Sequence, residues 1–237
     1  MSELDFSMNV SATLNILRLL FKPSLCLPHA TVSTFNDLPI PLTKAFQHYS
    51  TDRPIEIQAV VLDKDDCFAY PKSNEICKPY RDKFKELRQA YPGSRLLIVS
   101  NSAGTSDDPS GADADTLEQS TGVTVLRHST KKPGCGSRIL EYLRAQPQSA
   151  VERPDQIVVI GDRLFTDIMM ANLVGAWGIW VKDGVVQKKN LVSIIKPSQK
   201  HKVTEQQCSS LGGNINLRDT SRDKVYSLQN HEILSRL

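Results

Sequence analysis

The chain has 237 residues, 40% of them hydrophobic, which suits one domain with extensions. The formal net charge of +3 is too small to indicate a nucleic-acid partner, and no aromatic stacking pattern accompanies the basic pairs. The five cysteines form no Cys-x-x-Cys pair, and no run of about eighteen apolar residues occurs. The sequence therefore predicts neither a zinc site, nor a disulfide framework, nor a transmembrane helix.

Residues 9–22 have the pattern of a short amphipathic helix, with Leu14, Leu17 and Phe21 on one face and basic residues beside it. Two interpretations are open. The helix packs on the domain core or on another subunit, or it lies in the plane of a membrane against anionic lipid. The proline-rich residues 23–41 are typical of an extended connector.

From residue 55 onward, apolar strands alternate with helices. Strands are expected at 55–62, 96–99, 123–126, 157–160 and 176–181. Helices are expected from Pro79 to near Pro92, around 116–120, from Pro133 through Leu143, and at 165–174, with an exposed loop at 104–115. Most of these strands are continuous apolar runs, which is typical of parallel strands covered on both faces. The predicted fold class is therefore α/β, with a doubly wound parallel sheet.

This pattern also divides the chain. Residues 51–196 form the expected domain, residues 1–50 the N-terminal helix and connector, and residues 197–237 a polar tail that we expect to be flexible.

Polar and charged side chains follow four of the predicted strands. They are Asp63 and Asp65 after the first, Ser100 after the second, 127–133 after the third, and Asp162, Arg163 and Asp167 after the fourth. Ligands of open α/β sheets bind beyond the carboxyl ends of the strands, so these groups are candidates for one site. Each group alone is equally typical of a turn or a solvated surface. All four at successive strand ends are hard to obtain by chance.

In this order the motifs resemble those of the haloacid dehalogenase (HAD) superfamily of aspartate-based phosphatases, whose sheet is of the Rossmann type. The resemblance implies that Asp63 attacks phosphorus and forms an aspartyl-phosphate, while Asp65 acts as general acid and then as general base. It also implies that Ser100 hydrogen-bonds a transferring phosphoryl oxygen and that Lys132 neutralises charge.

The same resemblance implies a Mg²⁺ site. The ion would lie between the carboxylate of Asp63, the backbone carbonyl of Asp65 and the carboxylate of Asp162, with Asp167 as a ligand or as support for one. The threonine that the superfamily usually has four residues after the nucleophile is Cys67 here. We interpret this departure as minor, because the position mainly supports the loop.

The intervals between these motifs are short. One helix is expected between Asp63 and Ser100, and a loop, a helix and a strand between Ser100 and Lys132, so neither has room for a separate cap domain. A site without a cap suits a macromolecule, a membrane headgroup, or closure by another subunit.

The resemblance narrows further at Leu-Asp-Lys-Asp-Asp-Cys (62–67), Val-Ser-Asn-Ser-Ala-Gly (99–104), Val-Leu-Arg-His-Ser-Thr-Lys-Lys-Pro-Gly-Cys (125–135), Gly-Asp-Arg-Leu-Phe-Thr-Asp (161–167) and the N-terminal residues 9–29. These segments are similar to the mitochondrial phosphatidylglycerophosphate phosphatases of HAD subfamily IIIA. The resemblance implies hydrolysis of the terminal monophosphate of that phospholipid, giving phosphatidylglycerol on the route to cardiolipin. It implies a location in the mitochondrial matrix, peripheral to the inner membrane, and favours membrane contact through residues 9–22.

Such a headgroup carries a diester phosphate beside the monoester, so further cations would help to bind it. Candidates for substrate binding are Arg127, His128, Lys131 and Arg163, together with Asn101. Two alternatives remain: a HAD phosphatase for a soluble sugar or nucleotide phosphate, and a non-catalytic, membrane-associated assembly factor. The sequence also leaves a homo-oligomer open.

Overall fold

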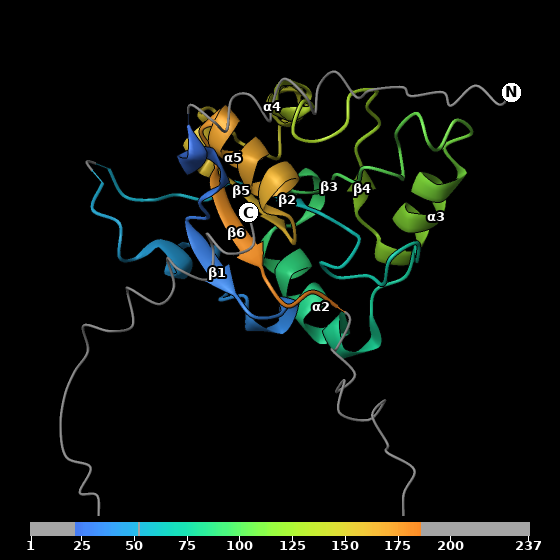
Figure 1. Ribbon diagram of the computed structural model, residues 1–237, viewed down its shortest axis with the longest axis horizontal. Coiled ribbons are helices and arrows are strands. Elements are labelled where there is room, and N and C mark those ends of the chain that lie inside the picture. Colours follow the sequence, from blue (N-terminus) through green and yellow to red (C-terminus); the bar gives the residue numbers. More distant parts are fainter. Residues whose placement is uncertain (1–21, 52, 186–237) are drawn as a thin grey trace, which may run out of the picture. The chain divides into compact units, whose positions relative to one another are not determined.

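A parallel sheet of six strands forms the centre of this computed structural model, which describes residues 22–51 and 53–185 (Figure 1). The strands are β1 (Ala30–Val32), β2 (Ala59–Leu62), β3 (Leu96–Ile98), β4 (Thr124–Val125), β5 (Ile157–Gly161) and β6 (Trp177–Val181). They lie in the order β1-β6-β5-β2-β3-β4, and every neighbouring pair is parallel. The helix expected at 9–22 lies outside the described residues, except for residue 22. The tail expected at 197–237 also lies outside them.

The order of the strands creates a switch point at β2. The chain proceeds outward from β2 to β3 and β4, and then returns to place β5 on the other side of β2. Val61 of β2 is therefore in register with Leu97 of β3 and with Val159 of β5. Ligands of open α/β sheets bind in the crevice beyond the carboxyl ends of the strands at such a point.

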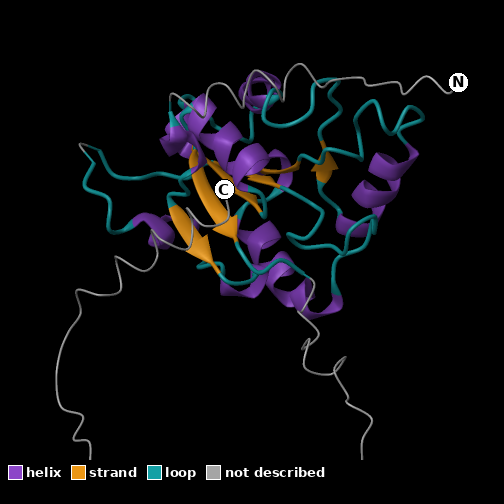
Figure 2. Cartoon of the chain, in the orientation of Figure 1, coloured by secondary structure: helices purple, strands orange, loops and turns teal. Residues whose placement is uncertain are grey.

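Helices cover both faces of the sheet, as Figure 2 shows by colour. The α-helices are α2 (Arg81–Ala90), α3 (Ala112–Thr121), α4 (Gly136–Ala145) and α5 (Met169–Val174). A π-helical turn, η7 (Leu164–Ile168), leads into α5. Short 3-10 helices are η1 (Pro23–Cys26), η2 (Phe35–Asp37), η3 (Leu42–Phe46), η4 (Lys78–Tyr80), η5 (Gly93–Arg95) and η6 (Pro154–Gln156). None of the helices in the described part of the chain has the length and apolar character needed to span a bilayer.

Successive residues of β2 point into two different cores because side chains alternate across a strand. Val60 and Leu62 belong to the core shared with α2 and α3, whereas Val61 belongs to the core shared with α4 and α5. All four residues of β2 are buried. A strand covered on both faces has to be apolar throughout, which explains the continuous apolar run. The predicted doubly wound α/β class is confirmed.

The segment expected to be a connector, 23–41, is instead part of the folded domain. Its residues Ala30–Val32 form β1 and pair with β6, and Phe35, Leu42 and Phe46 are buried. The segment Ala-Thr-Val is not a continuous apolar run, and the prolines around it are equally typical of a connector. The folded domain therefore begins before residue 51.

The expected loop at 104–115 is shorter than predicted, because α3 already begins at Ala112. The carboxylate of Asp108 accepts hydrogen bonds from the backbone N–H groups of Gly104, Asp113 and Ala114. Two of these donors lie in the first turn of α3, whose N–H groups have no partner within the helix. An acidic loop residue thus supports the start of the helix.

Candidate active site

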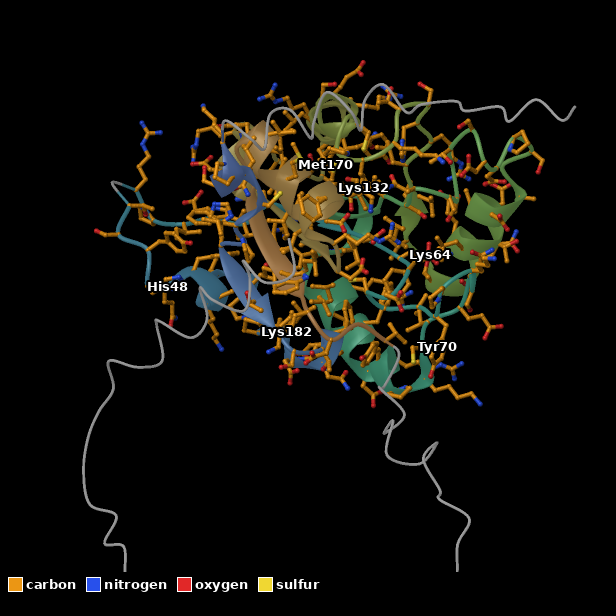
Figure 3. The ribbon with its side chains drawn as sticks, viewed as in Figure 1. His48, Lys64, Tyr70, Lys132, Met170 and Lys182 are labelled. Carbon is orange, nitrogen blue, oxygen red and sulfur yellow. The ribbon has the colours of Figure 1, made fainter. Side chains whose placement is uncertain are left out.

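Four strand ends meet at the carboxyl edge of the sheet, beside the β2–β5 switch point. The ammonium group of Lys132, which lies in the loop before α4, is 2.6 Å from Oδ1 of Asp63, directly after β2. The same ammonium group is 2.7 Å from Oδ1 of Asp167 in η7. All three side chains are buried, and Figure 3 labels Lys132 inside the fold. Residues from three separate segments therefore form one buried ionic group.

A third carboxylate completes this group. Asp63, Asp162 and Asp167 each offer an oxygen, and these oxygens all lie within 4.8 Å of one another. Burial, followed by the charge of Asp63, raises the pKa of Asp162 to about 8. Burial and Asp63 also raise the pKa of Asp167 to about 6, although Lys132 acts against this shift. Burial lowers the pKa of Lys132, but Asp167 and Asp63 outweigh burial and raise it overall.

This cluster has the chemistry of a site for a hard divalent cation. Oδ1 of Asp162 is buried and has no hydrogen-bond partner among the described residues. Carboxylate oxygens that share a small space repel one another, and Lys132 neutralises only one of the three charges. Oxygen donors of this kind are the ligands that Mg²⁺ prefers. The carboxylate of Asp65 lies outside the cluster, so only its backbone carbonyl remains available for the expected role as a ligand.

The sequence of the chain matches the model of a known family. The family model of mitochondrial PGP phosphatases matches residues 10–186. The chain belongs to this family. The predicted class of enzyme, a phosphoric monoester hydrolase, is thereby confirmed.

Curated relatives agree with this assignment. The mitochondrial phosphatidylglycerophosphatase GEP4 of Saccharomyces cerevisiae is 50% identical over 186 residues, which are 78% of this chain and 94% of the relative. A probable mitochondrial phosphatidylglycerophosphatase of Schizosaccharomyces pombe is 37% identical over 171 residues, 72% of this chain and 80% of the relative. A chloroplastic phosphatidylglycerophosphate phosphatase of Chlamydomonas reinhardtii is 34% identical over 126 residues, 53% of this chain and 44% of the relative.

In this member of the PGP phosphatase family, the carboxylate of Asp65 is held from two sides. Its Oδ1 accepts a hydrogen bond of 2.9 Å from the backbone N–H of Lys72 and lies 2.9 Å from the ammonium group of Lys64. Its Oδ2 is 3.4 Å from the hydroxyl of Ser102. These contacts come from the loop after β2 and from the loop after β3, so they set the direction of the carboxylate.

Lys64 is a site residue that the sequence interpretation missed. Its side chain is only 2% exposed, and besides Asp65 its ammonium group contacts the carbonyl of Ser73 at 3.0 Å and Oδ1 of Asn74 at 3.4 Å. The available signal was a lysine between two candidate aspartates, Asp63 and Asp65, at the end of a buried strand. A buried ammonium group requires partners, and these partners connect Lys64 to the 73–74 turn.

Gly161 and Cys67 support the cluster without contributing a ligand. A Cβ atom at Gly161 would lie 2.4 Å from Cγ of Asp167, so only glycine leaves room for this carboxylate beside the end of β5. Cys67 is fully buried, and its Sγ is 4.0 Å from the carbonyl of Ile160. Burial, together with the charge of Asp63, raises the pKa of its thiol, which keeps the thiol neutral.

The loop after β3 contributes Ser100 and Asn101. The hydroxyl of Ser100 accepts a hydrogen bond of 3.1 Å from the backbone N–H of Ser102. It also lies 3.0 Å from the hydroxyl of Ser102. Oδ1 of Asn101, expected to bind substrate, accepts a hydrogen bond of 2.8 Å from the backbone N–H of Lys132. This side chain therefore joins the β3 loop to the Lys132 loop.

Two of the four candidate cations are bound to acidic neighbours. Arg127 lies 2.6 Å from Asp115 and 2.8 Å from Glu118, both on α3. Lys131 lies 2.6 Å from Asp107. These pairs connect the loop after β4 to α3 and to the turn before it. Neither cation contacts the carboxylate cluster.

The other two candidates differ from each other. His128 is buried, with Nδ1 at 2.8 Å from the carbonyl of Thr130 and Nε2 at 3.0 Å from the carbonyl of Ser100. Burial lowers the pKa of this imidazole. The guanidinium of Arg163 is 47% exposed, with Nε 3.7 Å from Oδ2 of Asp162. Arg163 is therefore the candidate cation that lies at the mouth of the cluster.

Proposed function

We propose that this chain is a Mg²⁺-dependent phosphatase of the HAD superfamily, subfamily IIIA. It removes the terminal phosphate monoester of phosphatidylglycerophosphate and yields phosphatidylglycerol for cardiolipin synthesis. The observation that carries this proposal is the buried ionic group of Asp63, Lys132 and Asp167, beside Asp162 at the switch point of the sheet. The names of the curated relatives support the choice of substrate.

In the proposed reaction, a carboxylate oxygen of Asp63 attacks phosphorus. A phosphorus–oxygen bond forms to Asp63 while the bond to the glycerol oxygen breaks, and Asp65 gives its proton to the departing oxygen. Water then attacks the aspartyl-phosphate, Asp65 accepts the proton of this water, and phosphate leaves. Lys132, at 2.6 Å from Oδ1 of Asp63, neutralises charge in both steps.

Asp63, Asp162 and the backbone carbonyl of Asp65 would hold Mg²⁺, with Asp167 as a ligand or as support. The unpartnered Oδ1 of Asp162 and the three clustered carboxylates fit this ion. When bound, Mg²⁺ supplies positive charge that favours attack on an anionic phosphate ester. Ser100 would donate its hydroxyl to a phosphoryl oxygen.

The lack of a cap domain between residues 63 and 132 supports a lipid substrate. All residues from 63 to 132 are described, and between the two motifs that bound them lie η4, α2, η5, β3, α3 and β4 without a separate cap domain. A headgroup in a membrane surface can approach such a site, whereas a cap is needed to enclose a small soluble ester.

Arg163 is the cation that we assign to the diester phosphate of the headgroup. Arg127 and Lys131 are paired with carboxylates outside the cluster, and both ring nitrogens of His128 face carbonyl oxygens. The half-exposed Arg163 is instead paired, at 3.7 Å, with Asp162 of the cluster itself. Arg163→Gln should lower kcat/KM for the lipid about tenfold, as expected for a lost charged hydrogen bond, and leave soluble monoesters unaffected. The matched control is Arg127→Gln. Equal losses on the lipid and on soluble esters would contradict this role for Arg163.

We further propose a location in the mitochondrial matrix, peripheral to the inner membrane, with contact through residues 9–22. The names of the two fungal relatives support the organelle. In a folded double variant, Leu17→Glu with Phe21→Glu, binding to liposomes should decrease; unchanged binding would refute this contact. If residues 9–22 instead mediate self-association, the molar mass measured by light scattering should rise with protein concentration.

The decisive test is phosphate release from short-chain phosphatidylglycerophosphate beside a panel of soluble phosphomonoesters, with and without Mg²⁺. We expect a strong preference for the lipid, a requirement for Mg²⁺, and loss of turnover in Asp63→Asn. Better turnover of a soluble ester would refute the lipid substrate, and turnover by Asp63→Asn would refute the nucleophile.

A further inference from the structure

A hollow of about 410 Å³ lies between α2 and α3, away from the carboxylate cluster. We name it the cationic groove, and its lining includes Ile76, Arg81, Phe84, Lys85, Arg88 and Thr121. Its size is within the range of small-molecule sites, roughly 300–1,000 Å³. The proposed reaction does not use it.

Arg81, Lys85 and Arg88 occupy positions i, i+4 and i+7 of α2, so they lie along one face of the helix. Among the residues that the structure describes, none of the three forms an ion pair with a carboxylate. The lining contains one acidic residue, Glu75, against these three cations. The groove therefore carries excess positive charge that no internal partner neutralises.

Arg88 is held in place at one end of the groove. Its Nη1 donates a hydrogen bond of 2.9 Å to the carbonyl of Thr121 at the end of α3. Gly122 follows with a φ of 66°, and a Cβ atom there would lie 2.6 Å from Nη1 of Arg88. The absence of a side chain at Gly122 is thus what lets the guanidinium reach the end of α3.

Two apolar side chains, Ile76 and Phe84, also line the groove, together with Glu75, Ser120 and Thr121. Phe84 is buried in the core, and Ile76 is half-buried beside it. Guanidinium and ammonium groups above an apolar base are complementary to a phosphodiester attached to carbon chains. The nearby Tyr70 is 51% exposed and appears near the outer edge of the fold in Figure 3; exposed tyrosines of this kind are common at membrane interfaces.

We propose that the cationic groove binds the phosphodiester headgroup of an anionic phospholipid in a bilayer surface. This site goes beyond the proposed function, because its ligand needs no phosphate monoester. Basic residues near an anionic bilayer each strengthen binding by about fivefold.

The test compares binding of the full chain to vesicles of phosphatidylcholine alone and of phosphatidylcholine mixed with phosphatidylserine. Arg81→Gln with Lys85→Gln should weaken binding to the anionic vesicles roughly thirtyfold and leave binding to neutral vesicles unchanged. The matched control is Arg138→Gln with Arg144→Gln, which removes the same charge from α4 on the opposite face of the sheet. This control should keep most of the binding.

Three results would overturn the inference: no loss in the α2 variant, an equal loss in the α4 control, or binding of a soluble glycerophosphodiester that matches binding of the vesicles. Both altered residues of α2 are exposed, so an unchanged unfolding temperature is the check on folding. Phosphatidylserine carries no monoester, so this measurement succeeds or fails separately from the proposed hydrolysis.

Discussion

Lys132 determines the charge balance of the site. Its buried ammonium group lies between the carboxylates of Asp63 and Asp167. Lys132→Met would leave two buried carboxylates without their counter-ion, and loss of one partner of a buried pair costs about 3–5 kcal/mol. In the presence of a chelator, we expect a decrease of this order in the free energy of unfolding, measured with urea, and loss of phosphate release.

The neighbouring Lys131→Met is the matched control. Lys131 forms a surface pair with Asp107, and such pairs contribute about 0–1 kcal/mol. If Lys132→Met and Lys131→Met lower the free energy of unfolding equally, the buried ion pairs of Lys132 stabilise the fold no more than a surface pair does.

Lys64 is expected to position Asp65, the proposed general acid. Its ammonium group contacts Asp65 and the carbonyl of Ser73, which fixes the carboxylate relative to the loop that follows β2. Lys64→Met should lower kcat by about a hundredfold with a smaller change in KM, because a small displacement of a reacting group costs about this much. Lys72→Met is the control, since only the backbone N–H of Lys72 contacts Asp65. An increase in KM at constant kcat would point to substrate binding instead.

For single residues, the sequence predicted which charged groups form the cluster. It did not predict which acidic side chains the candidate cations would contact. Asp63, Lys132, Asp162 and Asp167 could be grouped because the carboxyl ends of parallel strands share one edge. The engagement of Arg127 with α3 could not be foreseen, because it depends on where that helix lies relative to the loop after β4. Long-range side-chain contacts of this kind leave no periodic signal.

Among the elements, the π-helical turn η7 places Asp167 against the end of β5. The backbone N–H of Arg163 donates to Oδ2 of Asp167, and Gly161 leaves the space that this carboxylate fills. Gly161→Ala would overpack this contact, which typically costs about 1–3 kcal/mol. We expect a lower urea midpoint and reduced phosphate release.

Gly178→Ala serves for comparison. A Cβ atom there would lie 3.2 Å from Cδ1 of Ile168, the movable end of a flexible side chain, so its effect should be smaller. If the two alanine variants lose the same stability, the close approach of Asp167 to the end of β5 is not what requires glycine.

The apolar pattern, more than length, explains which elements the sequence predicts: β3 and β4 have only three and two residues, but they lie within the largely apolar segments 96–99 and 123–126. β2, β5 and β6 have four or five residues and lie within apolar runs, and α2 and α4 each have ten residues with an apolar face. β1 has only three residues and lies at an edge of the sheet, where one partner strand is enough. A strand without a continuous apolar run is identified here by its pairing with β6, which only the tertiary structure supplies.

The pH dependence of stability belongs to the whole molecule, since it compares the folded and unfolded states. Burial and like charge raise the pKa of Asp162 to about 8 and that of Asp167 to about 6, from an ordinary value of 3.8. Between about pH 4 and about pH 8, the metal-free folded state therefore holds protons that the unfolded state has lost. Stability falls with rising pH wherever the folded state binds more protons.

We therefore expect the unfolding temperature of the chelator-treated protein to fall from about pH 5 to about pH 8. Asp162→Asn should reduce this slope, because it removes the carboxyl group with the larger shift. Excess MgCl₂ should reduce it as well, because a bound cation favours the ionised carboxylates. A slope that is unchanged in Asp162→Asn would assign the pH dependence to other groups.

The pairing of β1 with β6 also affects the order in which parts of the chain can fold during synthesis. Ala30 is in register with Ile179, so the first strand of the described residues pairs with the last of them. Closing so large a loop carries an entropic cost, and such non-local contacts form slowly. While the chain emerges from the ribosome, β1 has no strand to join until β6 has been made. We therefore expect the early apolar segment with Phe35 and Phe46, which is buried in the folded domain, to remain exposed during this time.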